Sequence, residues 1–198
     1  MGRQRQLRSA EQITDADSDA AQCAQRTERR EVRRFGLLVM LGCGGRVSAQ
    51  ELFFSAQAEG SSNNKYLEVF NPSCAVVPLG NYGIRSVTNG GEDFEHDLAF
   101  DDGAQIAAGG TWVICDPRAD ASILANCDQQ HRYLSNGDDA FALVTSGGTQ
   151  VLDIIGAVGE DPGAGWAVAG IDQATKDHTI VRKPGVLAGN AGNWEASA

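Results

Sequence analysis

Three aspartates in glycine-containing turns are the side chains best suited to chemistry in this sequence. Asp138 and Asp139 follow an Asn-Gly pair, and Asp161 begins an Asp-Pro-Gly turn. Carboxylate oxygens are ligands that Ca²⁺ prefers. The three residues are therefore candidate metal ligands, with Ca²⁺ as a possible cofactor.

A structural role competes with this interpretation. Asp138 or Asp139 would cap its own turn and pair with Arg182 or Lys183, as aspartates in Asn-Gly-Asp turns often do. We favour the structural role, because such contacts are routine for turns of this kind. The cysteines and histidines of the sequence show no metal-type spacing.

Catalytic motifs are missing from the sequence. It contains no Gly-x-Ser-x-Gly elbow, no phosphate-binding loop and no dinucleotide fingerprint. The histidines His96, His131 and His178 are scattered. His178 beside Asp177 resembles a base with its orienting carboxylate, but no nucleophile accompanies it, so we favour a structural hydrogen-bond network at a strand start. The sequence predicts no catalytic residues and a protein that is not an enzyme.

Short strands joined by turns must position these residues. A polar turn at residues 59–65 precedes residues 66–70, whose side chains alternate with the two-residue period of a strand. Glu59 and Lys65 are placed to bridge the ends of that turn. Further strands are predicted at 52–57, 75–79, 82–87, 94–100, 111–115, 140–144, 150–156, 165–168 and 179–182. This spacing, with one short helix, predicts an all-β sandwich and not an α/β fold.

Three cysteines follow residue 49, and two of them are placed to form a disulfide. Cys115 ends a predicted strand, and Cys127 follows the predicted helix at 121–126, for which Asp120 is the expected N-cap. In an exported chain a Cys115–Cys127 disulfide is favoured over two buried thiols. Cys74 is then left over, either buried and inert or available to a partner.

Residues 1–49 have the features of a leader that precedes the domain at 50–198. A polar extension leads to basic residues, then to a short apolar run at 35–42, and then to Val47-Ser48-Ala49. This order predicts a signal peptide cleaved after Ala49 and a secreted product. Two alternatives remain open: a lipid anchor on Cys43, within a loose lipobox, and a tail with no targeting role.

Charge is divided unevenly along the chain. Residues 1–49 contain nine arginines and six acidic residues, whereas the rest of the chain contains seven basic and 20 acidic residues. The domain therefore carries a net charge of −13. Affinity for nucleic acids rests mainly on Lys and Arg contacts to phosphate, so this charge disfavours direct DNA binding.

Several short motifs occur in a fixed order after residue 50. They lie at residues 59–65 and 67–72, 107–109 and 112–115, 135–140, 153–156, 161–166 and 177–183. Together they resemble the lamin-tail domain of bacterial and other secreted proteins. The resemblance implies an immunoglobulin-like β-sandwich over 50–198. Similar domains continue to a further tryptophan-bearing strand after residues 193–195, so we expect either that the last strand is missing or that the sequence is a fragment.

The resemblance also implies a function. Similar domains accompany secreted nucleases, phosphatases and other enzymes, or anchor them at surfaces, so we predict a non-catalytic, exported binding or display module. Its partner would be a protein or a surface component. The alternatives are the N-terminal piece of a secreted metal-dependent nuclease or phosphatase, and a calcium-stabilised adhesion module.

Overall fold

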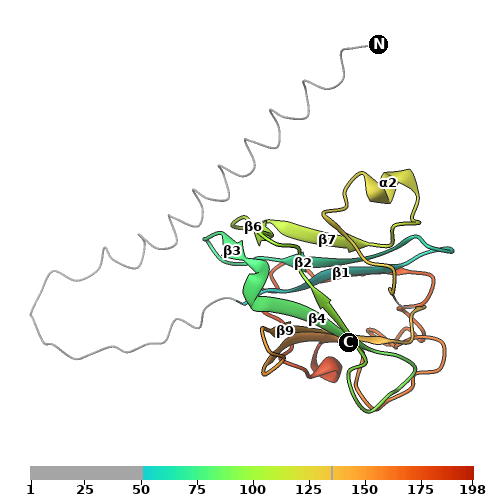
Figure 1. Ribbon diagram of the computed structural model, residues 1–198. Coiled ribbons are helices and arrows are strands. Elements are labelled where there is room, and N and C mark those ends of the chain that lie inside the picture. The colour runs from blue at the N-terminus through green and yellow to red at the C-terminus, as the bar shows by residue number, and fades with distance from the viewer. Residues whose placement is uncertain (1–50, 135) are drawn as a thin grey trace, which may run out of the picture. The chain divides into compact units, whose positions relative to one another are not determined.

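The computed structural model of the chain describes residues 51–134 and 136–198, which form two packed sheets and a small third sheet (Figure 1). The larger sheet has the strand order β11-β1-β2-β7-β8, the second has β10-β9-β4-β5, and β3 pairs with β6. The strands are β1 (Phe53–Glu59), β2 (Lys65–Phe70), β3 (Val77–Pro78), β4 (Tyr82–Val87), β5 (His96–Ala99), β6 (Gln105–Ile106), β7 (Thr111–Cys115), β8 (Gln129–Gln130), β9 (Ala140–Thr145), β10 (Val151–Ile155) and β11 (Thr179–Val181).

The core lies between the two larger sheets, where alternate side chains of each strand meet. In β2, burial alternates strictly, with Leu67 and Val69 buried and their neighbours half-buried. Across the sandwich, Phe141 and Leu143 of β9 belong to the same apolar cluster as Leu67. This arrangement confirms the predicted fold class, an all-β sandwich with one short helix.

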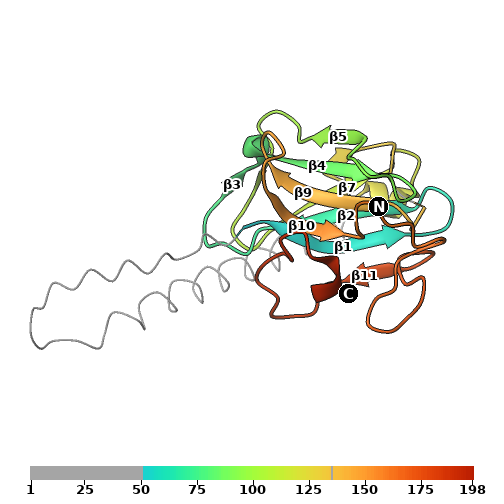
Figure 2. The ribbon, with the colours of Figure 1, turned by 90° about the horizontal axis from the view of Figure 1, so that it is seen from below.

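Strands β10 and β11 form the outer edges of the two sheets on the same side of the sandwich (Figure 2). Residues 156–178 connect β10 to β11 without a further strand, and the final segment, residues 186–198, lies beside these two strands. A register shift between Phe54 and Ala56 marks a bulge in β1 that lies close to β10. Bulges bend a strand and release amides from the ladder. The released Phe54 amide donates a hydrogen bond to the Asp153 carboxylate of the opposite sheet.

Most predicted strands are present, but three details differ. The short strands β6 and β8 were not predicted, because two residues carry no readable period. The strand predicted at 165–168 is absent from the described residues, where only an isolated bridge joins Val168 and Ile171. Trp166 in this segment is nevertheless buried, and its indole nitrogen donates to the Asp139 carbonyl at 3.0 Å.

Gly156 is required where the chain leaves β10. Its φ is +81°, and a Cβ at this position would lie 2.6 Å from the indole nitrogen of Trp166. Only glycine combines this left-handed backbone with so close an approach. The residue thus allows the Trp166 ring to close the end of the sandwich.

The predicted disulfide joins β7 to the segment after the helix. Cys115 and Cys127 are bonded, with their Cα atoms 5.9 Å apart, and the helix α2 (Ala121–Leu124) lies between them. Asp120 is the N-cap residue of this helix, as predicted, but its side chain makes no capping hydrogen bond. Its carboxylate instead accepts a hydrogen bond from the Asn64 amide at 2.9 Å, which ties the helix to the polar turn at 59–65.

Cys74 is exposed and is also disulfide-bonded, so the expectation of a leftover thiol is wrong. Cleavage after Ala49 and a lipid anchor on Cys43 concern positions outside the described residues. Among the helices that the structure describes, none is long and apolar enough to cross a membrane.

Candidate binding site

The aspartates predicted as metal ligands hold turns in place. One Asp139 carboxylate oxygen accepts a hydrogen bond from the Asn89 amide at 3.3 Å, and Asp161 accepts one from the Gly163 amide at 2.8 Å. Asp138 is half-buried in the same turn as Asp139. Within residues 51–134 and 136–198 no group of three or more His, Cys, Asp or Glu side chains could hold a metal ion. The calcium site therefore stays a prediction.

His178 and Asp177 do not form a catalytic pair in the described hydrogen-bond network. The imidazole Nδ1 of His178 lies against the Lys176 carbonyl, and the Asp177 amide donates to the Glu59 carboxylate. His178 is exposed. These contacts fix the start of β11, which is the structural role that the sequence favoured.

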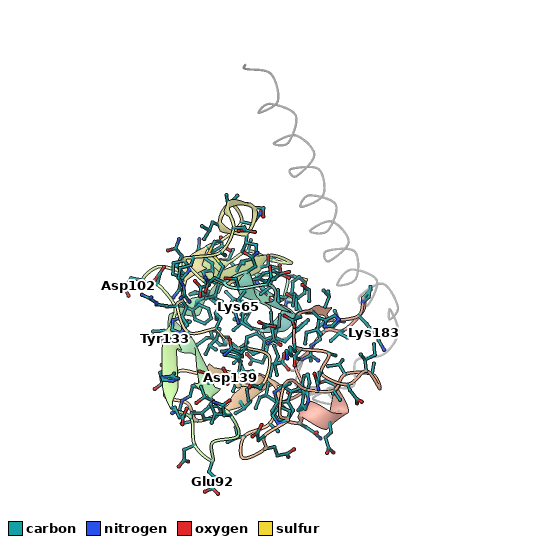
Figure 3. All side chains as sticks on the ribbon, turned by 90° about the vertical axis from the view of Figure 1, so that its right-hand side faces the viewer. Lys65, Glu92, Asp102, Tyr133, Asp139 and Lys183 are labelled. Atoms are coloured by element: carbon teal, nitrogen blue, oxygen red, sulfur yellow. A yellow bond between two sulfur atoms is a disulfide. The ribbon has the colours of Figure 1, made fainter. Side chains whose placement is uncertain are left out.

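A buried ion pair closes the turn at 59–65, as the sequence predicted. The Lys65 ammonium lies 2.9 Å from the Glu59 carboxylate, and their side chains are 7% and 9% exposed. Lys65 also donates to the side-chain oxygen of Asn136 at 2.9 Å. Figure 3 shows Lys65 within the body of the domain. Through Asn136 and the Asp177 amide, which donates to Glu59, the pair is joined to segments far apart in the sequence, so its role is structural.

Asp153 of β10 links the two sheets. It is completely buried and lies 2.6 Å from the Arg182 guanidinium. Its oxygens also accept hydrogen bonds from the Phe54 amide at 2.8 Å and the Asn190 amide at 2.9 Å. Burial raises the pKa of the Asp153 carboxyl above its ordinary value, while Arg182 and the two amides act in the opposite direction.

This contact corrects the partner that the sequence assigned to Arg182. The guanidinium pairs with Asp153, not with Asp138 or Asp139. The sequence contained both partners within separate motifs, at 153–156 and 177–183, but it held no signal that joined them. Their pairing depends on the proximity of β10 and β11.

A cavity of about 480 Å³ lies beside these residues, and we call it the lateral groove. It is bounded by β1, by β11 with the two residues after it, by Ile155, by residues 168–169 and by residues of the segment 186–198. Its walls are mainly aliphatic, and Trp194 contributes an aromatic ring. Figure 2 shows the final segment of the chain beside β1 and β11. Cavities of this size, with apolar walls and a few polar groups, are typical of ligand sites.

Gln57 of β1 lines the lateral groove and contains a buried polar atom without a partner. The residue is 3% exposed, and its side-chain oxygen accepts no hydrogen bond from the described residues. Its ladder partners are Leu67 and Ile180, so its side chain faces the interior of the sandwich. Trp112 carries another buried polar atom without a partner, but it does not line the groove.

Other buried amides of the domain are satisfied. The Asn71 amide nitrogen donates to three backbone carbonyls, and its oxygen accepts from the Ser73 amide. On the opposite side of the sandwich, Gln129 donates to the Ala99 carbonyl and accepts from the Asp101 amide. Buried polar groups are nearly always paired, so Gln57 is an exception that requires an explanation.

The charges around the lateral groove are opposite to those of the domain. Arg182 and Lys183 are two of the seven basic residues after position 49, and both line the groove. Among the described residues that line it, none has a carboxylate side chain. Figure 3 shows Lys183 at the edge of the domain. The groove thus combines apolar walls with two basic residues, of which Arg182 is paired with Asp153 and Lys183 is exposed.

Sequence reasoning did not find this site. Gln57 was assigned to a strand, Phe53–Glu59, in which its polarity between Ala56 and Ala58 was the available signal. A polar residue between apolar ones in a strand usually faces solvent, so this signal did not indicate a buried side chain. The direction of its side chain follows from the bulge in β1, which no sequence pattern indicated.

Comparison with known proteins does not assign the chain to a family. No protein-family model matches the sequence, and no curated protein matches it significantly. The function must therefore be argued from the fold and the groove.

Proposed function

We propose that residues 50–198 form a non-catalytic binding module of the lamin-tail type, which is exported and binds its partner in the lateral groove. The observation that carries the proposal is the lateral groove itself, a cavity of about 480 Å³ with mainly aliphatic walls at the β11 edge of the sandwich. Ligand sites in proteins are usually concave, with mainly apolar walls and a few polar groups.

The other motif residues support this choice of site, because their polar groups are occupied within the domain. Lys65 bonds Glu59 and Asn136, and Arg182 bonds Asp153. Such groups maintain the sandwich and are not available to a ligand without loss of the fold. The order of the motifs along the sequence is what supports the lamin-tail assignment.

Export is supported by the leader-like features of residues 1–49 and by the Cys115–Cys127 disulfide. Disulfides persist in oxidising compartments and are rare in the cytosol. The acidic domain is consistent with a partner other than nucleic acid. We therefore propose a protein or surface component outside the cytoplasm as the partner.

The proposal is tested with a variant that fills the groove. Ala188 lines the groove and is exposed, so Ala188→Leu blocks the cavity without entering the core. Ala125→Leu, at the exposed end of α2, is the matched control. The full chain and both variants are immobilised, and components captured from extracellular fluid and cell-surface fractions are quantified by mass spectrometry.

We expect at least one component that the unmodified chain and Ala125→Leu retain equally and that Ala188→Leu binds about tenfold more weakly, a difference of ~1.4 kcal/mol. Circular dichroism should show that all three proteins are equally folded. If every captured component is retained equally by Ala188→Leu, the groove is not the binding site and the proposal fails.

A further inference from the structure

We propose that the outer edge of β11 pairs with the β11 edge of a second copy of this chain, so that the larger sheets of two molecules join antiparallel about a twofold axis. The inference concerns this edge and goes beyond the proposed function, because it does not require that the lateral groove bind a partner. Three properties of the edge support it: unpaired backbone groups, exposed aliphatic side chains and charges that complement each other in a twofold pairing.

The outward backbone groups of β11 are unpaired. The Arg182 amide donates to the Ser55 carbonyl of β1 at 2.8 Å, and in an antiparallel ladder every second residue bonds the neighbouring strand. Ile180 therefore bonds β1, whereas the N–H and C=O groups of Thr179 and Val181 point away from it. Within the described part of the chain these outward groups form no hydrogen bond. Such an edge is a template for a further strand.

The neighbouring edge strand, β10, is covered by its own chain. The Ala191 amide donates to the Leu152 carbonyl at 3.0 Å. The Asn190 side chain accepts a hydrogen bond from the Ile154 amide at 3.0 Å and donates one to the Ile154 carbonyl at 2.8 Å. The final segment thus occupies the edge of β10, while the edge of β11, which Figure 2 shows at the margin of the larger sheet, is open to another strand.

Exposed aliphatic side chains gather on this side of the domain. Val181 of β11 is 69% exposed, Ile171 is 62% exposed and Leu187 is 46% exposed. Ile171 forms a bridge with Val168, which lines the same cavity as Val181, and Leu187 lies in the segment beside β11. Large apolar side chains that are exposed together are typical of an interface between proteins.

The charge of this part of the chain permits two copies to meet. Residues 172–198 contain three basic and three acidic residues, whereas residues 50–171 contain four basic and 17 acidic residues. The negative excess of the domain therefore lies outside the segment that includes β11. Salt at physiological concentration screens exposed charges that are more than about 8 Å apart, so the distant excess opposes the contact only weakly.

The charges that flank β11 favour a second copy over an unrelated strand. Asp177 precedes the strand and Lys183 follows it, each three positions from Ile180. Both side chains are exposed, and among the described residues neither forms an ion pair. Antiparallel pairing about Ile180 brings Asp177 of each copy beside Lys183 of the partner subunit. Opposite charges placed across two strands stabilise their pairing, and the twofold axis forms this pair twice.

Sedimentation velocity of the full chain at neutral pH and physiological ionic strength tests the inference. We expect a reversible equilibrium between monomer and dimer, with a dimer fraction that rises as the protein concentration approaches about 1 mM, the weak end of measured affinities. A protein that remains monomeric throughout this range would overturn the inference.

Val181→Pro tests the backbone pairing. Proline removes the outward amide donor from each copy, while its fixed φ suits an edge strand and the bonds of Ile180 to β1 are retained. We expect the dissociation constant to rise by at least about tenfold, because a donor is lost on both sides of the axis. Val181→Thr, which keeps the amide and the β-branched shape, is the control and should change the constant by less than about threefold.

Lys183→Glu tests the charge pairing, because it places two carboxylates together at each end of the contact. We expect a dimer about tenfold weaker. Arg132→Glu makes the same change of charge at an exposed residue after β8, the opposite edge of the larger sheet, and should weaken the dimer by less than about twofold. Asp177→Asn added to Lys183→Glu should recover most of the lost affinity, since asparagine tolerates the φ of +54° at this position.

Two results would contradict the proposed interface. Undiminished dimerisation of folded Val181→Pro would show that the copies associate through another surface, as would equal weakening by Lys183→Glu and Arg132→Glu. Circular dichroism establishes that each variant is folded, and the two glutamate variants decide the matter if Val181→Pro does not fold. The proposed function fails separately, when Ala188→Leu leaves the capture of partners unchanged.

Discussion

Two buried polar residues on opposite sheets differ in how their hydrogen bonds are completed. Asp153 is fully buried and receives bonds from Arg182 and from the Phe54 and Asn190 amides. Gln57 is almost as deeply buried, but its oxygen has no partner within the described residues. A satisfied group of this kind maintains the fold, whereas an unsatisfied one reduces its stability.

Substitution of Asp153 should be severe because it leaves a cation without its partner. We expect Asp153→Asn to lower the free energy of unfolding by about 3–5 kcal/mol, the cost of breaking a buried ion pair from one side. Urea denaturation at neutral pH measures the change. Asp97→Asn is the control, because its contact with Arg85 is 2.6 Å long but its side chain is 73% exposed.

The control Asp97→Asn should lower the free energy of unfolding by less than about 1 kcal/mol. Equal effects of the two substitutions would mean that Asp153 does not hold the sheets together. The interpretation of the motifs at 153–156 and 177–183 as a structural clamp would then be wrong.

The edge strands decide where the domain is closed and where it is open. Strands β5 and β8 lie at one side, where Gln129 spans the gap with two hydrogen bonds to the backbone around β5. Strands β10 and β11 lie at the other side, where Asp153 and Arg182 span one end and the lateral groove remains beside them. The two sides of the sandwich therefore differ: Gln129 connects the sheets at one, and the lateral groove lies at the other.

The disulfide fastens α2 and β8 to the edge of the larger sheet. We expect the double variant Cys115→Ala/Cys127→Ala to unfold at a lower urea concentration, with a loss of about 3 kcal/mol, because the bond closes a loop between residues 12 positions apart. Unfolding in the absence of reductant measures it. Ser122→Ala, on the exposed surface of α2, is the control and should change the stability little.

An unchanged midpoint for the double variant would show that the loop is held without the bond. In that case the packing of Cys115, which is fully buried, would account for the position of the loop. The disulfide would then contribute little to the free energy of unfolding.

Charge acts on the molecule as a whole. The chain has a formal net charge of −10 at pH 7, and the domain after residue 49 carries −13. Such an excess favours solubility and opposes the compact state through self-repulsion. We also predict from this charge that the domain does not bind duplex DNA directly.

Salt should therefore stabilise the full chain at neutral pH. We expect the melting temperature to rise as NaCl screens the repulsion, by about 3 °C for each ~1 kcal/mol that is relieved. Differential scanning calorimetry over a series of NaCl concentrations measures the effect. The same series near the sequence pI of about 4.7 is the control and should show a smaller rise. A melting temperature that falls with NaCl at pH 7 would show that attractive ion pairs outweigh the repulsion.

The sequence by itself determined the fold class, the bounds of β4 and the Cys115–Cys127 and Glu59–Lys65 pairings. These follow from short-range properties: the two-residue period, turn composition and the spacing of a strand end from a helix end. The calcium site and the leader were also predicted from local patterns, and they remain predictions.

The tertiary structure alone decided which distant residues meet. It paired Arg182 with Asp153, assigned the side chain of Asp120 to Asn64 and placed Gln57 in a groove. Each of these depends on the register of neighbouring strands and on one bulge in β1, where a shift of a single residue sends a side chain to the opposite face. Local patterns specify which segments become strands, but the contacts between segments are fixed only when the two sheets pack together.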